Sequence, residues 1–181
     1  RVNATLGREI VPEYQATPAE KRKKVLVVGG GPCGMEAARV AAERGHGVVL
    51  YEKGKRLGGL VPLAAIVKDC ETPELLDFVR YQQRGLRKAG VTVHKGTTVT
   101  PDIVRTEKPD AIIVAAGAVH PEVELPGYSR SNVIRTDKLY GMLDFFLKFF
   151  DSGWLQRLTH LWMPVGRRVV IMGGTLHGCE L

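Results

Sequence analysis

Three glycines in the spacing GxGxxG, at Gly29, Gly31 and Gly34, predict a site for a phosphate-bearing ligand. The first permits a tight turn, the second removes a β-carbon where a pyrophosphate approaches, and the third lets a helix pack closely on a strand. Glu52 follows eighteen positions after Gly34, where a carboxylate accepts both ribose hydroxyls of a dinucleotide and repels a 2′-phosphate. The combination favours dinucleotide binding over a purely structural glycine turn.

The segments around these glycines predict a βαβ unit. The apolar, β-branched run 24–29 is typical of a strand buried on both faces, helix formers fill 32–44, and 46–52 predicts a second strand. Gly45 lies just past the helix, where a left-handed C-cap is favoured. The free N–H groups and the positive dipole end of a helix that begins near Pro32 would face the phosphates.

The remaining reactive residue types predict no further chemistry. Cys33 lies inside the glycine turn, and we interpret it as a small packing residue; a reactive thiol is the alternative. Cys33, Cys70 and Cys179 are far apart and form no CxxC, so neither a metal site nor a redox dithiol is expected. No nucleophile, paired carboxylates or base constellation is visible, so we predict no catalytic residue.

Length, composition and charge limit the classes of protein to which the chain can belong. With 181 residues and 44% hydrophobic content, the chain can bury a core. The net charge is +7, but the one basic run is 21–24 and no basic residues alternate with aromatic ones on an expected face, so nucleic acid is not an expected partner. No secretory leader or membrane-spanning stretch is visible, so a cytoplasmic location is expected.

A second glycine pair distinguishes between cofactors. Glu52 is followed by Lys53 and then by RLGG, from Arg56 to Gly59. A carboxylate, a basic residue and RxGG in this order resemble the two-dinucleotide-binding flavoproteins, whereas the alternative is a simple surface turn. The resemblance implies an α/β, Rossmann-like, three-layer FAD/NAD(P)-binding fold, truncated in this chain, with the second glycine pair near the FAD diphosphate.

The middle of the chain extends this resemblance. A core-packed helix is predicted over 72–90, with Thr72 as N-cap and Gly90 as the stop. The strand in 91–100 is followed in the resembled family by a segment that passes the adenine, and a buried strand within 108–118 leads into an ATG-like turn. The residues that the resemblance assigns to the cofactor are Gly29, Gly30, Gly31, Pro32, Cys33, Gly34, Glu52, Lys53, Arg56, Gly58, Gly59, Leu60, Val99, Ala115, Ala116 and Gly117.

The last residues repeat the opening pattern. In 166–181 a basic flank and an apolar strand lead to Gly173, Gly174 and Gly178, which we predict as the start of a second, NAD(P)-binding site. Thr175 stands where the middle glycine would be, and NAD is not distinguished from NADP.

The first residues narrow the resemblance further. RVNATLGRE, 1–9, resembles the segment that precedes this module in multidomain reductases of the 2,4-dienoyl-CoA reductase and trimethylamine dehydrogenase type, with Ala4 in place of the usual proline. In those enzymes an old-yellow-enzyme barrel with FMN and a 4Fe-4S cluster comes first. The resemblance implies electron transfer from NAD(P)H through FAD to a separate FMN domain that reduces an unsaturated, enoyl- or dienoyl-type substrate.

We expect four parts: a linker at 1–22, an FAD (or ADP)-binding domain at 23–127, an aromatic-rich helical insertion at 128–165, and the start of the second nucleotide domain at 166–181. The insertion is expected to pack on the remaining domains of the enzyme or on a partner subunit. An amphipathic helix at a membrane surface is the alternative.

Two other functions remain open. An NAD-dependent dehydrogenase domain would explain the first motif but not RxGG, and a non-catalytic scaffold would retain only ADP or bind a polyanion. On the leading interpretation, the isolated chain binds FAD weakly and has little turnover, because the segment that completes the flavin site in the resembled fold is missing.

Overall fold

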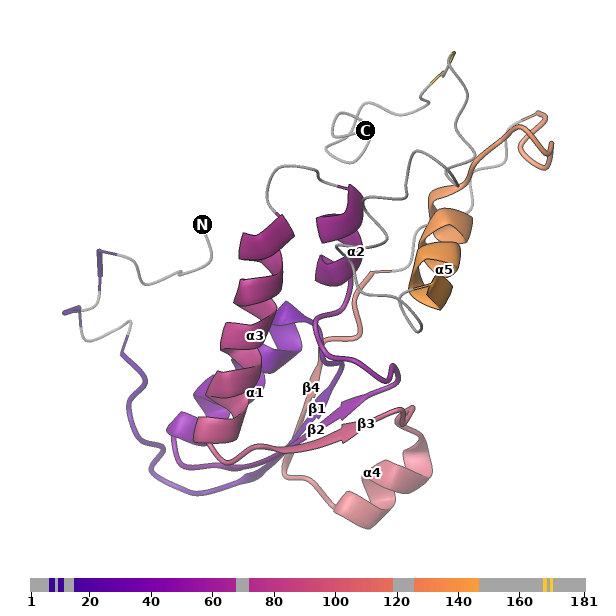
Figure 1. Cartoon of the computed structure of the whole chain (residues 1–181). Helices are drawn as coiled ribbons and strands as arrows, with labels where there is room; N and C mark the ends of the chain where they lie inside the picture. Colours follow the sequence, from indigo (N-terminus) through magenta and orange to yellow (C-terminus); the bar gives the residue numbers. More distant parts are fainter. Residues whose placement is uncertain are drawn as a thin grey trace. The chain divides into compact units, whose positions relative to one another are not determined.

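The computed structural model describes residues 7–8, 10–11, 15–67, 72–118, 126–146, 168 and 170 (Figure 1). The chain divides into two compact units. The first comprises Arg1–Gly59 and Phe78–Gly117, and the second Leu60–Asp77 and Ala118–Leu181. The four parts expected from the sequence stay a prediction.

The first unit is built on a parallel sheet with strand order β3-β2-β1-β4. The strands are β1 (Lys24–Val28), β2 (Gly47–Glu52), β3 (Thr92–Lys95) and β4 (Ala111–Val114). The chain moves outward from β1 through β2 to β3 and then crosses back to β4. Right-handed connections therefore place the helices that follow β1 and β2 on one face of the sheet, and the helix that follows β3 on the other face. The predicted α/β, Rossmann-like fold is confirmed.

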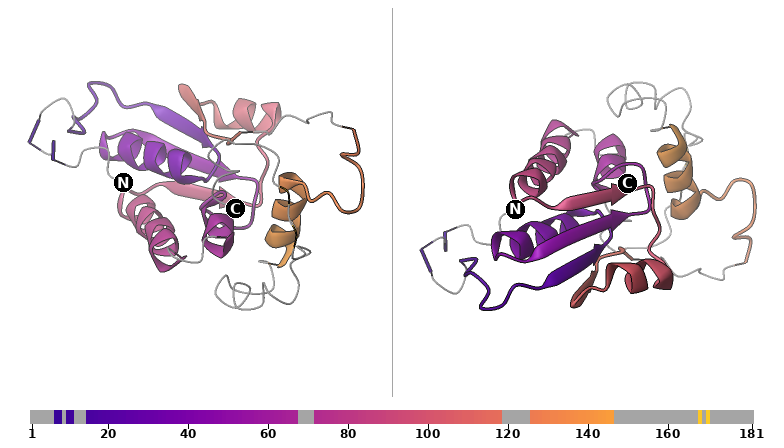
Figure 2. Two further views of the ribbon diagram at one scale, coloured as in Figure 1. Left: turned by 90° about the horizontal axis from the view of Figure 1, so that it is seen from above. Right: turned by 90° about the horizontal axis from the view of Figure 1, so that it is seen from below.

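Helix α1 (Pro32–Glu43) lies on one face of this sheet, together with the part of α3 (Thr72–Lys88) that belongs to the first unit, and α4 (Pro101–Glu107) lies on the other (Figure 2). The core between α1 and the strands contains side chains that are at most 1% exposed. These are Leu26, Val27, Met35, Ala38 and Leu50. Each large aliphatic side chain buried in this way contributes roughly 1.5–3 kcal/mol to stability.

The termini of α1 follow the sequence signals, whereas Thr72, predicted as the N-cap of the next long helix, is the first residue of α3 itself. Gly31 is the N-cap of α1 with Pro32 at the first position, and Gly45 adopts φ +94° past its end. Helix α4 was not expected from the sequence. It begins after Thr100, whose hydroxyl accepts a hydrogen bond from the Ile103 N–H at 3.5 Å, and ends at Lys108 in the left-handed conformation.

A polar cluster holds α4 to the sheet. The Tyr51 hydroxyl donates to Glu107 Oε1 at 2.6 Å, and the Lys24 ammonium lies 2.8 Å from Glu107 Oε2. The Tyr51 ring stacks on His94, with 4.7 Å between the ring centroids. The hydrogen bonds that Lys24 and Tyr51 donate to Glu107 lower the pKa of this carboxyl group. The bond between Tyr51 and Glu107 also raises the pKa of the Tyr51 hydroxyl.

Strand β4 departs from the expectation of a fully buried strand. Its residues alternate between half-buried and exposed, and Ile112 and Val114 are 46% and 74% exposed. β4 is an edge strand of the described sheet. The apolar run therefore predicted the strand correctly but not its burial, because burial depends on neighbours that lie outside the strand's own sequence.

The second unit contains α2 (Val61–Val67) and α5 (Thr136–Phe146), which contact each other and bury Leu63 and Leu143. Helix α5 falls within the segment predicted to be helical and aromatic-rich. Residues 128–135 of that segment contain turns and no regular helix, and 147–165 lie outside the described residues. Within the described part of the chain, no helix is long and apolar enough to cross a membrane.

Candidate dinucleotide site

Gly29 makes the turn at the carboxyl end of β1. It adopts φ +109°, and its N–H donates to the Tyr51 carbonyl at 2.8 Å. A β-carbon at this position would overlap the carbonyl oxygen of Ala115 and lie 2.7 Å from its carbonyl carbon. Both the backbone conformation and the neighbouring chain therefore require glycine here.

Gly34 lets α1 lie directly on this turn. A β-carbon at Gly34 would overlap the carbonyl oxygen of Gly29 and lie 3.0 Å from its carbonyl carbon. Because the obstacle is backbone, it cannot move aside without displacing the turn itself. Gly29 and Gly34 are thus required by the chain's own packing.

Gly31 is different, because nothing in the described chain requires a glycine there. Its φ is −73°, and a β-carbon would meet only the Cα of Gly59, at the ordinary contact distance of 3.9 Å. The space that the missing side chain leaves is therefore not filled by the described chain. This is the feature expected where a ligand approaches the backbone.

The second glycine pair lies against the first motif. The Gly58 N–H donates to the Gly30 carbonyl at 2.8 Å. Gly59 adopts φ +57°, and a β-carbon on it would lie 3.1 Å from the Cα of Gly31. The structure thus brings RxGG and GxGxxG, which are separate in sequence, to the same turn.

The start of α1 has the electrostatics of an anion site. Gly31 caps the helix without a side-chain hydrogen bond, and the first turn contains no acidic residue. Met35 donates its N–H to the Gly31 carbonyl, which leaves the amides of Cys33 and Gly34 at the positive end of the helix dipole. Cys33 is a free, exposed thiol in this turn.

Glu52 is held in place at the end of β2. Its Oε2 accepts the Gly30 N–H and its Oε1 accepts the Gly54 N–H, both at 2.6 Å. The side chain of Leu57 packs where a β-carbon on Gly30 would be. A carboxylate has about four lone-pair sites, so both oxygens retain acceptor capacity for ribose hydroxyls.

The turn after β4 also lies at this end of the sheet. The Ala115 N–H donates to the Val28 carbonyl at 2.8 Å, and Gly117 adopts φ +82°. Ala116 is exposed beside them, and its Cα would lie 3.2 Å from a β-carbon on Gly29. The ATG-like turn therefore borders the glycine turn directly.

The segment that leads to Val99 lies beside the end of β2. The Gly96 and Thr97 N–H groups donate to the carbonyls of Gly54 and Glu52 at 2.9 and 3.0 Å. Val99 itself is half-buried. This places the predicted adenine segment next to the carboxylate predicted to hold the ribose.

The remaining predicted cofactor residues lie after β2 or near the end of the chain. Lys53 and Arg56 are exposed in the loop after β2, and Leu60 begins the second unit. The tentative second site, Gly173, Gly174 and Gly178, lies outside the described residues.

Sequence reasoning overlooked Gln82. This residue of α3 is only 4% exposed, and its Nε2 donates to the Pro32 carbonyl at 3.0 Å, in the first turn of α1. The sequence feature that points to Gln82 is its position between Val79 and Leu86, as a polar residue on a face of α3 that is otherwise apolar.

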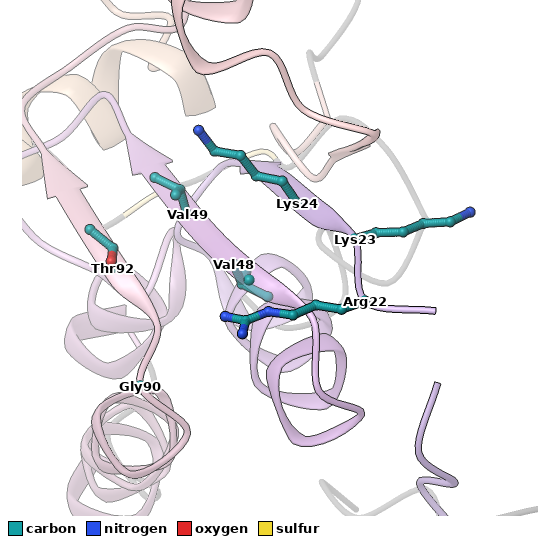
Figure 3. Close-up of a pocket in the computed structure, with 8 residues that line it drawn as sticks. Arg22, Lys23, Lys24, Val48, Val49, Gly90 and Thr92 are labelled. Atoms are coloured by element: carbon teal, nitrogen blue, oxygen red, sulfur yellow. The ribbon is translucent and has the colours of Figure 1, made fainter. Parts of the chain in front are cut away.

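A hollow at the opposite end of the strands does not resemble this site (Figure 3). It is lined by Arg22, Lys23, Lys24, Gly47, Val48, Val49, Gly90 and Thr92. The Lys23 and Lys24 side chains point in different directions (Figure 3), and Lys24 is paired with Glu107. Open α/β sheets bind ligands at the carboxyl ends of their strands, which is where the glycine turn lies.

Residues 23–181 match the family described as pyridine nucleotide-disulphide oxidoreductase. The chain belongs to this family. Its FAD/NAD(P)-binding fold agrees with the geometry of the glycine turn, and the resemblance to multidomain reductases is confirmed by its relatives. The chain is 36% identical over 179 residues to bilirubin reductase of Mediterraneibacter gnavus, covering 99% of this chain and 24% of that protein.

Two further relatives are also reductases. Cinnamate reductase of Clostridium sporogenes is 33% identical over 183 residues, which cover 99% of this chain and 23% of the relative. The structure of a 2-naphthoyl-CoA reductase complex superposes with a TM-score of 0.69 at 35% identity, covering 78% of this chain and 21% of that one. This chain thus spans about a quarter of the length of the curated relatives that it matches.

Proposed function

We propose that the first unit binds FAD and serves as an electron-transfer module of an NAD(P)H-dependent flavin oxidoreductase. The observation that supports this most directly is the vacant β-carbon position of Gly31, beside an α-helix start that has no side-chain cap. Family membership supports FAD and NAD(P)H as the cofactors.

The chain's own residues would bind and orient the cofactor. The amides of Cys33 and Gly34 would donate to the diphosphate, and Glu52, fixed by two backbone N–H groups, would accept the ribose hydroxyls. Gly59, which has no β-carbon to press against Gly31, would let the RxGG turn lie beside the diphosphate. When bound, FAD supplies the hydride chemistry, whereas the protein supplies position and electrostatics.

The complete enzyme is the second part of the proposal. Its remaining domains would contain FMN and a 4Fe-4S cluster, and an enoyl- or dienoyl-type substrate would be reduced at the FMN. The support is that bilirubin reductase, cinnamate reductase and 2-naphthoyl-CoA reductase all carry names of reductases and are about four times as long as this chain. The partner is then the rest of the same enzyme or another subunit.

A scaffold that binds ADP alone is the alternative with an observation in its favour. The contacts built around Gly29, Gly31 and Glu52 account for the adenosine and diphosphate half of FAD, and all belong to the first unit. An NAD-dependent dehydrogenase domain is less well supported, because it gives no reason for the RxGG turn to lie on the first motif.

The test is an absorbance spectrum of the purified protein, with the heat-released ligand identified by mass. A flavin spectrum and the mass of FAD are the expected result. ADP as the sole ligand would favour the scaffold, and NAD would favour the dehydrogenase. Because this chain alone is expected to bind FAD weakly, the measurement is repeated after addition of FAD and removal of excess.

The isolated 181-residue chain is expected to hold FAD below one equivalent and to oxidise NADH slowly. Full FAD occupancy with sustained NADH oxidation would refute it.

A further inference from the structure

Gln82, which is 4% exposed, is the one buried side chain with an amide or charged group in the part of the chain that the structure describes. It lies on the same face of α3 as Val79 and Leu86, which are 5% and 1% exposed. Positions three and four residues apart on a helix face the same side, so an apolar residue at 82 would serve the packing. The amide therefore requires a different explanation.

The hydrogen bond of Gln82 supplies that explanation. Its Nε2 donates at 3.0 Å to the carbonyl of Pro32, the first residue of α1. The bond thus joins α3 to the turn whose amides lie at the positive end of α1. It reaches the backbone one residue away from Gly31 and from Cys33.

The oxygen atom of the same amide shows that a glutamine at this position also lowers the stability of the fold. Gln82 Oε1 is buried and has no hydrogen-bond partner among the described residues. A buried oxygen without a partner destabilises a fold. Methionine, which has nearly the same shape, would avoid that cost but would release Pro32.

We propose that Gln82 is a positioning residue that holds the first turn of α1 in the orientation in which its N–H groups bind a diphosphate. The inference rests on the proposed nucleotide-binding function and names a further residue on which that site depends. Gln82 need not touch the ligand. It acts through Pro32, and its effect is expected on the phosphates and not on the adenosine.

The experiment measures the affinity of the protein for two probes, ADP and adenosine, by isothermal titration. In Gln82→Met, the dissociation constant for ADP is expected to rise about three- to tenfold, because the ligand must then order a turn that one hydrogen bond no longer holds, and the strength of that bond sets the upper limit. The constant for adenosine should change by less than about twofold. Gln83→Met is the matched control, because Gln83 is the neighbouring, half-buried glutamine of α3.

Gln82→Leu provides a second variant in case the first fails to fold. It removes both the donor and the unpartnered oxygen without burying a charge, so a similar and equally selective loss of ADP affinity is expected. Equal losses for ADP and adenosine, or unchanged ADP affinity in a folded variant, would overturn the inference. If the unmodified protein binds neither probe, the proposed nucleotide-binding function is wrong. That outcome differs from one in which the unmodified protein binds ADP and the Gln82 variant loses affinity for both probes equally.

Discussion

Substituting Gly31 by alanine tests whether the glycine is required for ligand binding or for folding. A β-carbon at Gly31 meets only the Cα of Gly59, at 3.9 Å, and the residue's φ of −73° suits any amino acid. Reduced entropy of the unfolded chain favours alanine by about 0.4–1 kcal/mol, whereas the loss of glycine at an N-cap disfavours it by a similar amount. The free energy of unfolding should therefore change by less than about 1 kcal/mol.

The same methyl group is expected to weaken ligand binding strongly. It would occupy the space in which a diphosphate approaches the start of α1, and each charge-assisted hydrogen bond lost there is worth about 1.5–3 kcal/mol. Since about 1.4 kcal/mol corresponds to a tenfold change, the dissociation constant for ADP should rise at least about tenfold.

The assay combines thermal unfolding without ligand and titration with ADP, using Gly34→Ala as the control. A methyl group on Gly34 overlaps the Gly29 carbonyl oxygen, so that variant should lose stability whether or not a ligand is present. Gly31→Ala with unchanged ADP affinity would refute the reasoning. So would a loss of stability in Gly31→Ala as large as that in Gly34→Ala.

The remaining predictions concern Glu52 and Glu107. Glu52→Gln leaves one backbone N–H, of Gly30 or Gly54, facing an amide nitrogen, so stability should fall by about 1–3 kcal/mol in thermal or urea unfolding. The same variant should discriminate less between ADP and its 2′-phosphorylated form in titrations, because the repelling charge is gone; unchanged discrimination would contradict the assignment of Glu52 to the ribose. The pKa of Glu107 is lower in the folded protein than its usual value, so its contribution to stability is present above the usual carboxyl pKa and is lost as the pH falls through the folded value. Unfolding measured across this acidic range should show that loss, and Lys24→Met, which removes the Glu107 partner that lowers the pKa most, should diminish it; an identical pH dependence in both proteins would contradict the role of the pair.

Much of the first unit follows from local sequence signals. The β-branched run before Gly29, the helix formers after Pro32 and the glycine at 45 each act within a few residues, and the structure contains the corresponding β1, α1 and left-handed turn. Helix α4 was not predicted, although Thr100 and Pro101 supply an N-cap and a first-position proline. The alternating polar and apolar residues of 91–100 predict a strand, but β3 spans only Thr92–Lys95 of this segment.

Other features depend on partners that are distant along the chain. The sequence marks Gly31 and Gly59 only as members of two motifs, and their proximity depends on the loop after β2 folding back onto the turn after β1. Similarly, Gln82 is fifty residues from Pro32 along the chain and bonds to it only because α3 and α1 lie on the same face of the sheet.

The sequence by itself determined the βαβ unit, the three-glycine turn and the acidic residue after the second strand, because strand periodicity, helix termini and glycine conformations are decided over a few residues. The tertiary structure alone decided which glycines the chain requires for its own packing, which one leaves space, and which buried amide holds the start of α1. These depend on the distances between atoms of Gly29, Ala115, Gly59 and Gln82 and their neighbours, and such distances exist only once the sheet and its helices have packed.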